Sequence, residues 1–493
     1  MLDGTDRADQ SALQRKEFTI RRVLKLGVTG KGKSTMNNMG RRSVIRGAVA
    51  LTATGALARP YIANADAKTA VVWVNQGFVP AEDAAFKQLA ADYMKASGNK
   101  LDYSIMPFMA QNQKTISALT SGDVPDLIFM DAPATIIAQN AWDDKFIDVT
   151  DVVTPYDNQL SDTAKLGSTF YNKVTRKRSY YLCPIKQGGT PFHVWGNLVE
   201  KAGAKVSDIP DTWDARWDFF KPMQKELRGK GMRRIYAIGL QVTTVGPNDG
   251  NNLYQHFMIA NGGKGIVTPD GKLHTDDPQV REAAIKSTTF LADSYKAGVV
   301  PPEALSWNDA DDNNGYHEKL FIADFDGTLS TELAMINNKE DFLAAVTLGM
   351  PNYGDGTPIP CQVGVGGGFI PKGAKGVEVA KDLMKYWMQP KVMDDNLKAG
   401  LGRWVPAIPQ AVKDDPFWLQ SSDPHLKPYV EEAVLNPTLP PFEGFTPAWG
   451  QVAAEQLQQG TVADVVKNGM TPTQAVDKAF KRMDQIFAKM SFD

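Results

Sequence analysis

The sequence predicts an α/β protein with a mostly parallel sheet, and two observations support this class. The first is the alternation of strand and helix patterns between residues 70 and 130, because a βαβαβ order places consecutive strands side by side in one direction. The second is a new series of strands and helices after residue 185. The chain has 493 residues, which is long enough for two domains with separate cores.

The first series of elements follows from hydrophobic periodicity. Residues 70–74 are an apolar run typical of a buried strand, and the next helix places Phe86, Leu89 and Tyr93 on one face. The pattern predicts strands at 70–74, 101–105, 126–130 and 180–185, helices at 82–96 and 112–120, and a turn at 121–125.

A second series begins with a strand at 192–195, and the chain is expected to cross into a second domain just before it. The remaining predicted elements are helices at 198–202, 253–260, 280–297, 376–388 and 473–490, a strand at 235–241 and a glycine-rich turn at 364–368.

An export signal is predicted at the N-terminus. Arg41 and Arg42 precede a weakly apolar stretch at 47–58, which leads to the small-x-small site Ala65-Asp66-Ala67. The stretch is shorter than the roughly 20 residues that span a bilayer. It resembles a twin-arginine signal, so residues 1–67 are expected to be removed after export to the periplasm. The length of this leader leaves Met1, Met36 and Met39 as alternative starts.

Composition limits the partners of the exported chain. Without residues 1–67 it has 42 Lys and Arg against 51 Asp and Glu, a formal charge of −9. Nucleic-acid binding depends on clustered cations, so neither nucleic acid nor an anionic membrane is an expected partner. The chain is expected to be a monomer.

Two motifs resemble phosphate chemistry. Residues 27–34 match the phosphate-loop pattern G-x-x-x-x-G-K-S, but they lack a convincing strand and helix on either side and precede the predicted cleavage site. Asp324-Phe-Asp-Gly-Thr resembles the first motif of haloacid-dehalogenase-type phosphatases, in which Asp324 would attack phosphorus and Asp326 would help to hold Mg²⁺. The later Lys and carboxylates of that chemistry are not evident, so this phosphatase stays an alternative.

Other candidate catalytic or metal-binding patterns are weaker. Residues 309–315 resemble a calcium loop, but the glycine is displaced by one place and Leu320 stands where the bidentate Glu should be. They are interpreted as a solvated acidic loop. The five histidines lack metal-ligand spacing. No catalytic residue, metal site or cofactor is therefore predicted.

A family resemblance rests on ordered landmarks across residues 70–490. After the export signal these are 121–127, 181–184, 197–213, 321–335, and 366–371 with the helix that follows. In this order they resemble the extracellular solute-binding proteins of ABC importers, specifically the carbohydrate-binding group that includes maltose-binding protein. The resemblance implies two α/β lobes joined by crossing hinge strands, with a ligand between them. It places 68–184 plus 353–402 in the N-terminal lobe and 185–352 plus 403–493 in the C-terminal lobe.

Candidate ligand-binding residues follow from the rule that clefts in open α/β sheets lie beyond the carboxyl ends of the strands. A sugar presents hydroxyls at its edge and C–H groups on its faces, so amides, carboxylates and aromatic rings are expected around it. The residues that follow predicted strands are Asn75, Gln76, Phe78, Asp131, Asp326 and Gly327.

Four tryptophans in polar or Pro/Gly-rich segments are candidates for stacking on a sugar: Trp195, Trp307, Trp404 and Trp449. At least two of them are expected to meet the cleft. Trp449 aligns best with a segment that supplies a stacking ring in the family, and Arg403 could give bidentate hydrogen bonds.

The two cysteines, Cys183 and Cys361, fall near the hinge strands that the resemblance implies. A disulfide or a close thiol pair at the hinge is therefore a hypothesis, because the predicted compartment is oxidising.

The resemblance implies a binding protein that captures a sugar or polyol and delivers it to a membrane permease driven by a separate ATPase. The alternative is a secreted hydrolase, either a glycoside hydrolase or the phosphatase using Asp324 and Asp326.

Overall fold

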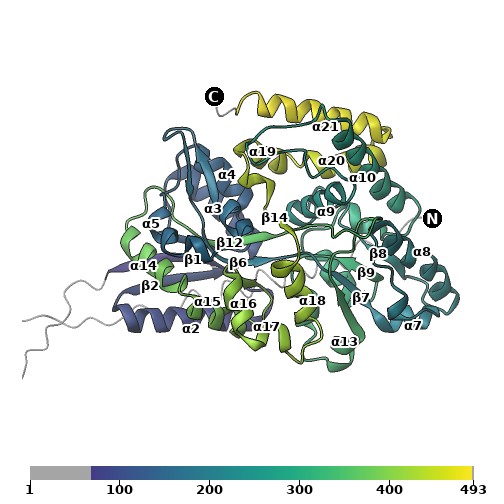
Figure 1. The fold of residues 1–493 in the computed structure, drawn as a ribbon, viewed down its shortest axis with the longest axis horizontal. Coiled ribbons are helices and arrows are strands. Elements are labelled where there is room, and N and C mark those ends of the chain that lie inside the picture. Colours follow the sequence, from purple (N-terminus) through teal and green to yellow (C-terminus); the bar gives the residue numbers. More distant parts are fainter. Residues whose placement is uncertain (1–67, 491–493) are drawn as a thin grey trace, which may run out of the picture. The chain divides into compact units, whose positions relative to one another are not determined.

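The computed structural model describes residues 68–490, and these contain two large sheets, each with its own apolar core. The part of the chain built on the first sheet is called the first lobe, and the part built on the second sheet is called the second lobe (Figure 1). The export signal, its cleavage site, the alternative starts and the phosphate-loop pattern lie outside the described residues.

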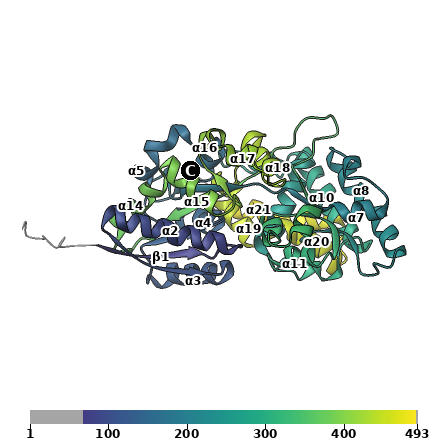
Figure 2. The same ribbon diagram turned by 90° about the horizontal axis from the view of Figure 1, so that it is seen from below.

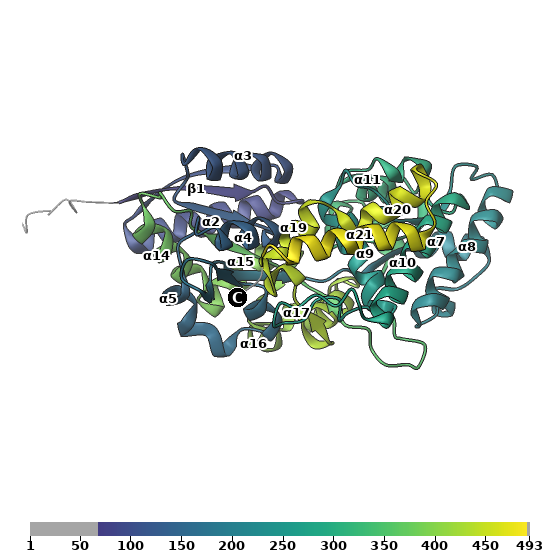
Figure 3. The ribbon, with the colours of Figure 1, turned by 90° about the horizontal axis from the view of Figure 1, so that it is seen from above.

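The first lobe confirms the predicted βαβαβ order. β1 (Thr69–Asn75), β2 (Lys100–Met106) and β3 (Leu127–Met130) alternate with α2 (Pro80–Ser97) and α3 (Phe108–Ser121). β1 pairs in parallel with both β2 and β3. Figures 2 and 3 show α2 and α3 on opposite faces of this part of the sheet.

Local sequence explains these elements. Ala70, Val72 and Val74 of β1 are buried, while Val71 between the first two is exposed, as a period of two requires. In α2 the buried side chains include Phe86, Leu89 and Tyr93, and Glu82 accepts a hydrogen bond from the backbone N–H of Val79 at the helix start.

The first sheet has the strand order β13-β6-β12-β3-β1-β2. Its later strands are β6 (Cys183–Gly188), β12 (Gly364–Phe369) and β13 (Val405–Pro406). β12 is antiparallel to both β3 and β6, so the chain returns to the first lobe through the middle of its sheet.

The glycine run that was predicted as a turn is strand β12, and this prediction was wrong. Gly366, Gly367 and Gly368 are not among the residues with positive φ, so a turn conformation does not explain them. A Cβ at Gly367 would lie 1.9 Å from the carbonyl oxygen of Cys183. The glycines are required by the close approach of neighbouring strands.

The second lobe is built on a sheet of order β10-β7-β9-β8. Its strands are β7 (Phe192–Trp195), β8 (Tyr236–Gly239), β9 (Phe321–Phe325) and β10 (Ala345–Leu348). The longer helices around it are α8 (Trp213–Gly229), α9 (Pro247–Ala260), α10 (Pro278–Lys296), α19 (Pro447–Ala454), α20 (Leu457–Lys467) and α21 (Pro472–Phe487). The C-terminal helices, yellow in Figure 3, pack on α9 and α10.

Aromatic rings fill much of the second core. Trp217 of α8 packs against Phe192 at 4.7 Å and Phe257 at 5.4 Å between ring centroids. Helix α8 presents this ring inward because its apolar residues recur at helical spacing.

The chain crosses between the lobes three times. The first crossing joins β6 to β7, the second joins β10 to β11 (Cys361–Gln362), and the third precedes β14 (Thr438–Leu439), which pairs with β11. Residues 404–433 contribute to the first core, whereas the sequence analysis assigned them to the second lobe. These residues belong to the first lobe, because β13 pairs with β6.

Between residues 68 and 490, no helix combines the length and the apolar character needed to cross a membrane.

Candidate functional site

A buried network of charged side chains lies at the carboxyl ends of the first-lobe strands. Asp131, which follows β3, accepts a hydrogen bond from Lys186 of β6 at 2.6 Å and is 3.3 Å from Arg403. Arg403 also pairs with Glu82 at 3.0 Å. Burial raises the pKa of Asp131, but Lys186 and Arg403 outweigh it and lower the pKa overall. Asp131 is therefore an anion held between two cations.

Two residues that the strand-end rule selected lie together at this network. The side chain of Asn75, after β1, accepts a 2.8 Å hydrogen bond from the backbone N–H of Asp131. Its amide nitrogen is buried and makes no hydrogen bond within the described residues. Asn75 thus fixes the loop that carries Asp131 and still offers a donor.

Trp404 completes the first-lobe part of the site. Together with Asn75, Asp131 and Lys186 it lines a cavity of about 40 Å³. The Lys186 ammonium lies 4.7 Å from the centre of the Trp404 ring. The indole N–H of Trp404 and Nε of Arg403 are buried without a hydrogen-bond partner in the described part of the chain. These donors would suit the hydroxyls of a polyhydroxylated ligand.

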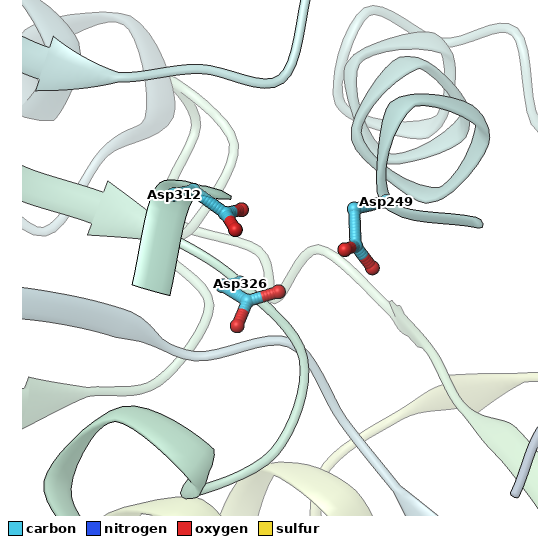
Figure 4. A group of neighbouring side chains, drawn as sticks. All are labelled: Asp249, Asp312 and Asp326. Carbon is cyan, nitrogen blue, oxygen red and sulfur yellow. The ribbon is translucent and has the colours of Figure 1, made fainter. Parts of the chain in front are cut away.

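The second lobe contributes an acidic cluster. Asp326 follows β9, Asp312 lies in α11 (Asp311–His317), and Asp249 lies in the first turn of α9. One carboxylate oxygen from each lies within 4.8 Å of the other two, and Figure 4 shows the three side chains converging. Burial raises the pKa of all three, and neighbouring carboxylates raise those of Asp249 and Asp312 further. Arg403 and His193 partly oppose the increase at Asp326.

Part of this cluster was not predicted from the sequence, because residues 309–315 were interpreted as a solvated acidic loop. Residues 311–315 instead form most of α11, in which Asp312 and Asn313 are 0% and 3% exposed. Asn313 donates a 2.6 Å hydrogen bond to Asp326. Hydrophobic periodicity does not predict this burial, because the buried residues are polar and face the carboxylates of the cluster.

Lys186 and Glu82 were also missed. Lys186 directly follows the strand predicted at 180–185, so the strand-end rule could have selected it, although in the structure it lies inside β6. Glu82 lies in the first turn of α2, where a carboxylate is explained by the helix start alone.

Three of the four tryptophan candidates pack in the second core, while Trp404 packs in the first core beside the charged network. That at least two of the four meet the cleft stays a prediction. Trp195 and Trp449 are 0% exposed and Trp307 is 6% exposed. Trp195 stacks on Tyr316 and donates to its carbonyl oxygen at 2.9 Å. Trp307 packs near Phe321, and Trp449 packs edge-on against Phe442.

The remaining predicted residues are more open. The ring of Phe78 is 37% exposed and lies 5.6 Å from the Arg403 guanidinium carbon. Gln76 is exposed, and its backbone N–H bonds to the carbonyl of Met106. A Cβ at Gly327 would meet no atom within 4 Å, so this turn has open space beside it.

The phosphatase alternative is not supported by the placement of Asp324. This side chain is 0% exposed, and one oxygen accepts a hydrogen bond from the backbone N–H of Phe325. Burial, followed by the charge of Asp326, raises its pKa. A nucleophilic carboxylate has to be ionised and open to its substrate.

The proposed disulfide is not formed. Cys183 and Cys361 are free and buried. Cys183 pairs with Gly368 at one end of the β6–β12 ladder, while Cys361 precedes the other end. The family resemblance placed both cysteines near the hinge strands, but it did not show that they lie at opposite ends of the β6–β12 ladder.

A buried polar chain lies beneath Asp326. His193 contacts the carbonyl oxygen of Asp326 at 3.2 Å and carboxylate Oε1 of Glu332 at 2.6 Å. Burial lowers the pKa of His193, but Glu332 outweighs it and the pKa rises to about 9. Burial raises the pKa of Glu332, but His193 lowers it to about 2. They form an ion pair at neutral pH.

The hinge contains a second cavity, of about 300 Å³, lined in part by Cys361, Met350 and Glu432. Glu432 accepts hydrogen bonds from the Cys361 thiol at 3.3 Å and the Met350 N–H at 2.8 Å. Burial raises its pKa to about 7 despite these donors. A carboxyl group in the hinge therefore changes charge near neutral pH.

This shift predicts a pH dependence of stability. Because the pKa of Glu432 is raised on folding, its contribution favours the folded state below pH 4.5 and is lost as the pH rises through about 7. Between pH 4.5 and 8 the free energy of unfolding of the wild type should fall by about 2–4 kcal/mol relative to Glu432→Gln. Urea denaturation across this range checks it, with the neighbouring Glu431→Gln as control. Parallel pH profiles for wild type and Glu432→Gln would contradict the assignment.

Comparisons with solved structures agree with the two-lobed architecture. An ABC transporter solute-binding protein from Thermotoga lettingae, bound to α-D-tagatose, matches with a TM-score of 0.70 and 20% identity, over 85% of this chain and 99% of that chain. A sugar transporter protein from Arthrobacter chlorophenolicus with bound laminaribiose has a TM-score of 0.66, 18% identity and coverage of 86% and 100%. For a solute-binding protein from Agrobacterium radiobacter in complex with ribitol these values are 0.65, 18%, 86% and 99%.

These likenesses show that the fold is that of two-lobed periplasmic binding proteins. A comparison with curated proteins gives no match. A sequence model of bacterial extracellular solute-binding proteins matches residues 88–428, which run from α2 through both sheets. Since this match spans more than half of the chain, the protein belongs to the bacterial extracellular solute-binding protein family.

Proposed function

We propose that this protein binds a sugar or polyol between its two lobes and delivers it to the permease of an ABC importer, which a separate ATPase drives. The observation that carries the proposal is the set of buried, partly unpartnered polar groups around Trp404: Asp131, Lys186 and Arg403 from the first lobe. Charged and amide groups beside an aromatic ring match the hydroxyl edge and C–H face of a sugar. Bound tagatose, laminaribiose and ribitol in proteins of the same fold support this ligand class.

The ligand would enter by hinge motion. The first-lobe cavity of about 40 Å³ has room for roughly one water molecule, so a sugar needs the lobes to move apart and close again around it. The crossings at β6–β7, β10–β11 and before β14 would be the hinges.

Export to the periplasm is part of this proposal. The family is extracellular, and Arg41, Arg42 and the site at Ala65–Ala67 supply a signal and a cleavage point. The exported protein should begin near Lys68 by N-terminal sequencing. An intact Met1 on exported protein would contradict the cleavage.

Calorimetric titration with a panel of monosaccharides, disaccharides and polyols, including those three compounds, tests the ligand class. We expect binding of at least one compound, with the compound recovered unchanged. Release of a hydrolysed product would instead favour a secreted hydrolase.

Replacing Trp404 should weaken binding of whichever compound is found. In Trp404→Ala we expect a loss of affinity of roughly tenfold or more, since one stacked ring and its burial contribute about 1.4 kcal/mol or more. Trp404→Phe, which retains a ring, should lose less. The control is Trp142→Ala, because Trp142 does not line this cavity. Unchanged affinity in Trp404→Ala, with folding confirmed by circular dichroism, would remove Trp404 from the site.

A further inference from the structure

The acidic cluster of the second lobe has the geometry of a cation site. Asp249, Asp312 and Asp326 come from three separate elements, and one oxygen of each lies within 4.8 Å of the others. Ca²⁺ binds oxygen at about 2.3–2.6 Å. Three oxygens no more than 4.8 Å apart lie at most about 2.8 Å from a point between them. One ion there can contact all three after side-chain shifts of a few tenths of an ångström.

A second observation, apart from the clustering, points to a ligand. The Asp312 side chain is 0% exposed, and its Oδ1 accepts a hydrogen bond from the N–H of Asn313. Its Oδ2 has no partner among residues 68–490, and Figure 4 shows this carboxylate directed toward the gap between Asp249 and Asp326. A buried carboxylate oxygen without a donor is costly.

Gln241 adds an uncharged oxygen near the same place. Its side chain is 4% exposed and lies close enough to the Asp312 carboxyl to lower the pKa of that group. Its amide nitrogen donates to the carbonyl of Asn308 at 3.0 Å, while its Oε1 is buried and unpartnered in the described chain.

Residues 68–490 do not supply a cation of their own here. The nearby basic groups are engaged elsewhere: His193 with Glu332, and Arg403 with Glu82 and Asp131. No ion pair between residues 68 and 490 involves a member of the cluster. Carboxylates taken out of water are normally paired or bound to a metal.

We propose that Asp249, Asp312 and Asp326 bind a divalent cation, and that the cation is Ca²⁺. The donors are all oxygens, which suits Ca²⁺ or Mg²⁺ rather than metals that prefer nitrogen or sulfur. Ca²⁺ fits better than Mg²⁺ because it tolerates irregular geometry and ligands from separate elements. The site joins the first turn of α9, α11 and the end of β9, so the ion ties these segments of the second lobe together. This site does not depend on the identity of the sugar.

The test uses the exported chain, residues 68–493, stripped with EDTA and titrated with CaCl₂ in the absence of sugar. Calorimetry should show a binding heat, and the melting temperature should rise by about 3 °C at a hundredfold excess over Kd. Asp312→Asn should lose both signals and, without metal, melt no lower than the wild type, because one repelling charge is gone. Asp249→Asn is a second variant that tests the same site, because Asp249 is a half-buried residue of α9.

Asp311→Asn is the matched control, since it removes the same charge from the adjacent residue of α11, and it should keep the calcium response. The proposal is overturned if the wild type shows neither heat nor a thermal shift with CaCl₂ up to 10 mM, or if Asp312→Asn and Asp249→Asn both retain the shift. A response to MgCl₂ but not to CaCl₂ would also overturn the assignment to Ca²⁺. Because no sugar is present, the outcome is separate from the test of sugar binding.

Discussion

Glu332→Gln is expected to lower the free energy of unfolding by about 3–5 kcal/mol at pH 7. Glu332 and His193 are both 0% exposed, and their contact of 2.6 Å is an ion pair. Removing the carboxylate leaves the imidazolium without its counter-charge in a site that water does not reach, which is the costly way to break a buried pair. Thr347 donates to the same carboxylate at 2.7 Å and would lose its strongest acceptor.

Urea denaturation followed by circular dichroism measures this effect. Glu340→Gln, an exposed residue at the start of α13 (Lys339–Ala344), is the control and should change stability by less than about 0.5 kcal/mol. A loss below 1 kcal/mol in Glu332→Gln would mean that the pair is not a principal support of the second sheet.

The second large effect is expected from Trp449→Ala, which should also lower the free energy of unfolding by about 3–5 kcal/mol. Trp449 is fully buried and packs against Phe442 and Phe487, with ring centroids at 5.3 and 6.5 Å. Removing the indole leaves a cavity between α19 and the end of α21 that the surrounding rings cannot fill.

This variant also separates two roles of tryptophan in the protein. The protein that remains folded at low temperature should bind its ligand with nearly wild-type affinity, whereas Trp404→Ala should not. A Trp449→Ala protein of normal stability that had lost ligand affinity would show instead that Trp449 is the stacking ring.

The sequence predicted the first lobe well because its signals are local. The apolar run of β1 and the helical spacing of α2 each determine an element without knowledge of the rest of the chain. The strand-end rule then found Asn75 and Asp131, which do lie together. Parallel pairing of β1 with β2 and β3 followed from the alternation itself.

The predictions that failed depended on distant contacts. Trp195 and Trp449 lie in or near polar or Pro/Gly-rich segments, but they are buried against Tyr316 and Phe442, which no periodicity connects to them. The glycines within residues 364–368 indicate a turn when the sequence is considered alone, and only the closeness of a neighbouring strand explains them. The burial of Asp312 could not be predicted from its hydrophilic stretch, because polar residues that face water and polar residues that face a buried polar centre give the same sequence pattern.

The glycine strand β12 has a consequence for the thermodynamics of recognition. It runs between β3, which leads to Asp131, and β6, which carries Lys186, and a Cβ at Gly366 would lie 2.5 Å from the carbonyl oxygen of Asp131 and 3.0 Å from Lys186. The spacing of the backbone segments that carry these two charges is therefore set by a strand ladder. Such a preorganised site loses little conformational entropy when a ligand arrives, so more of the contact energy is retained as affinity.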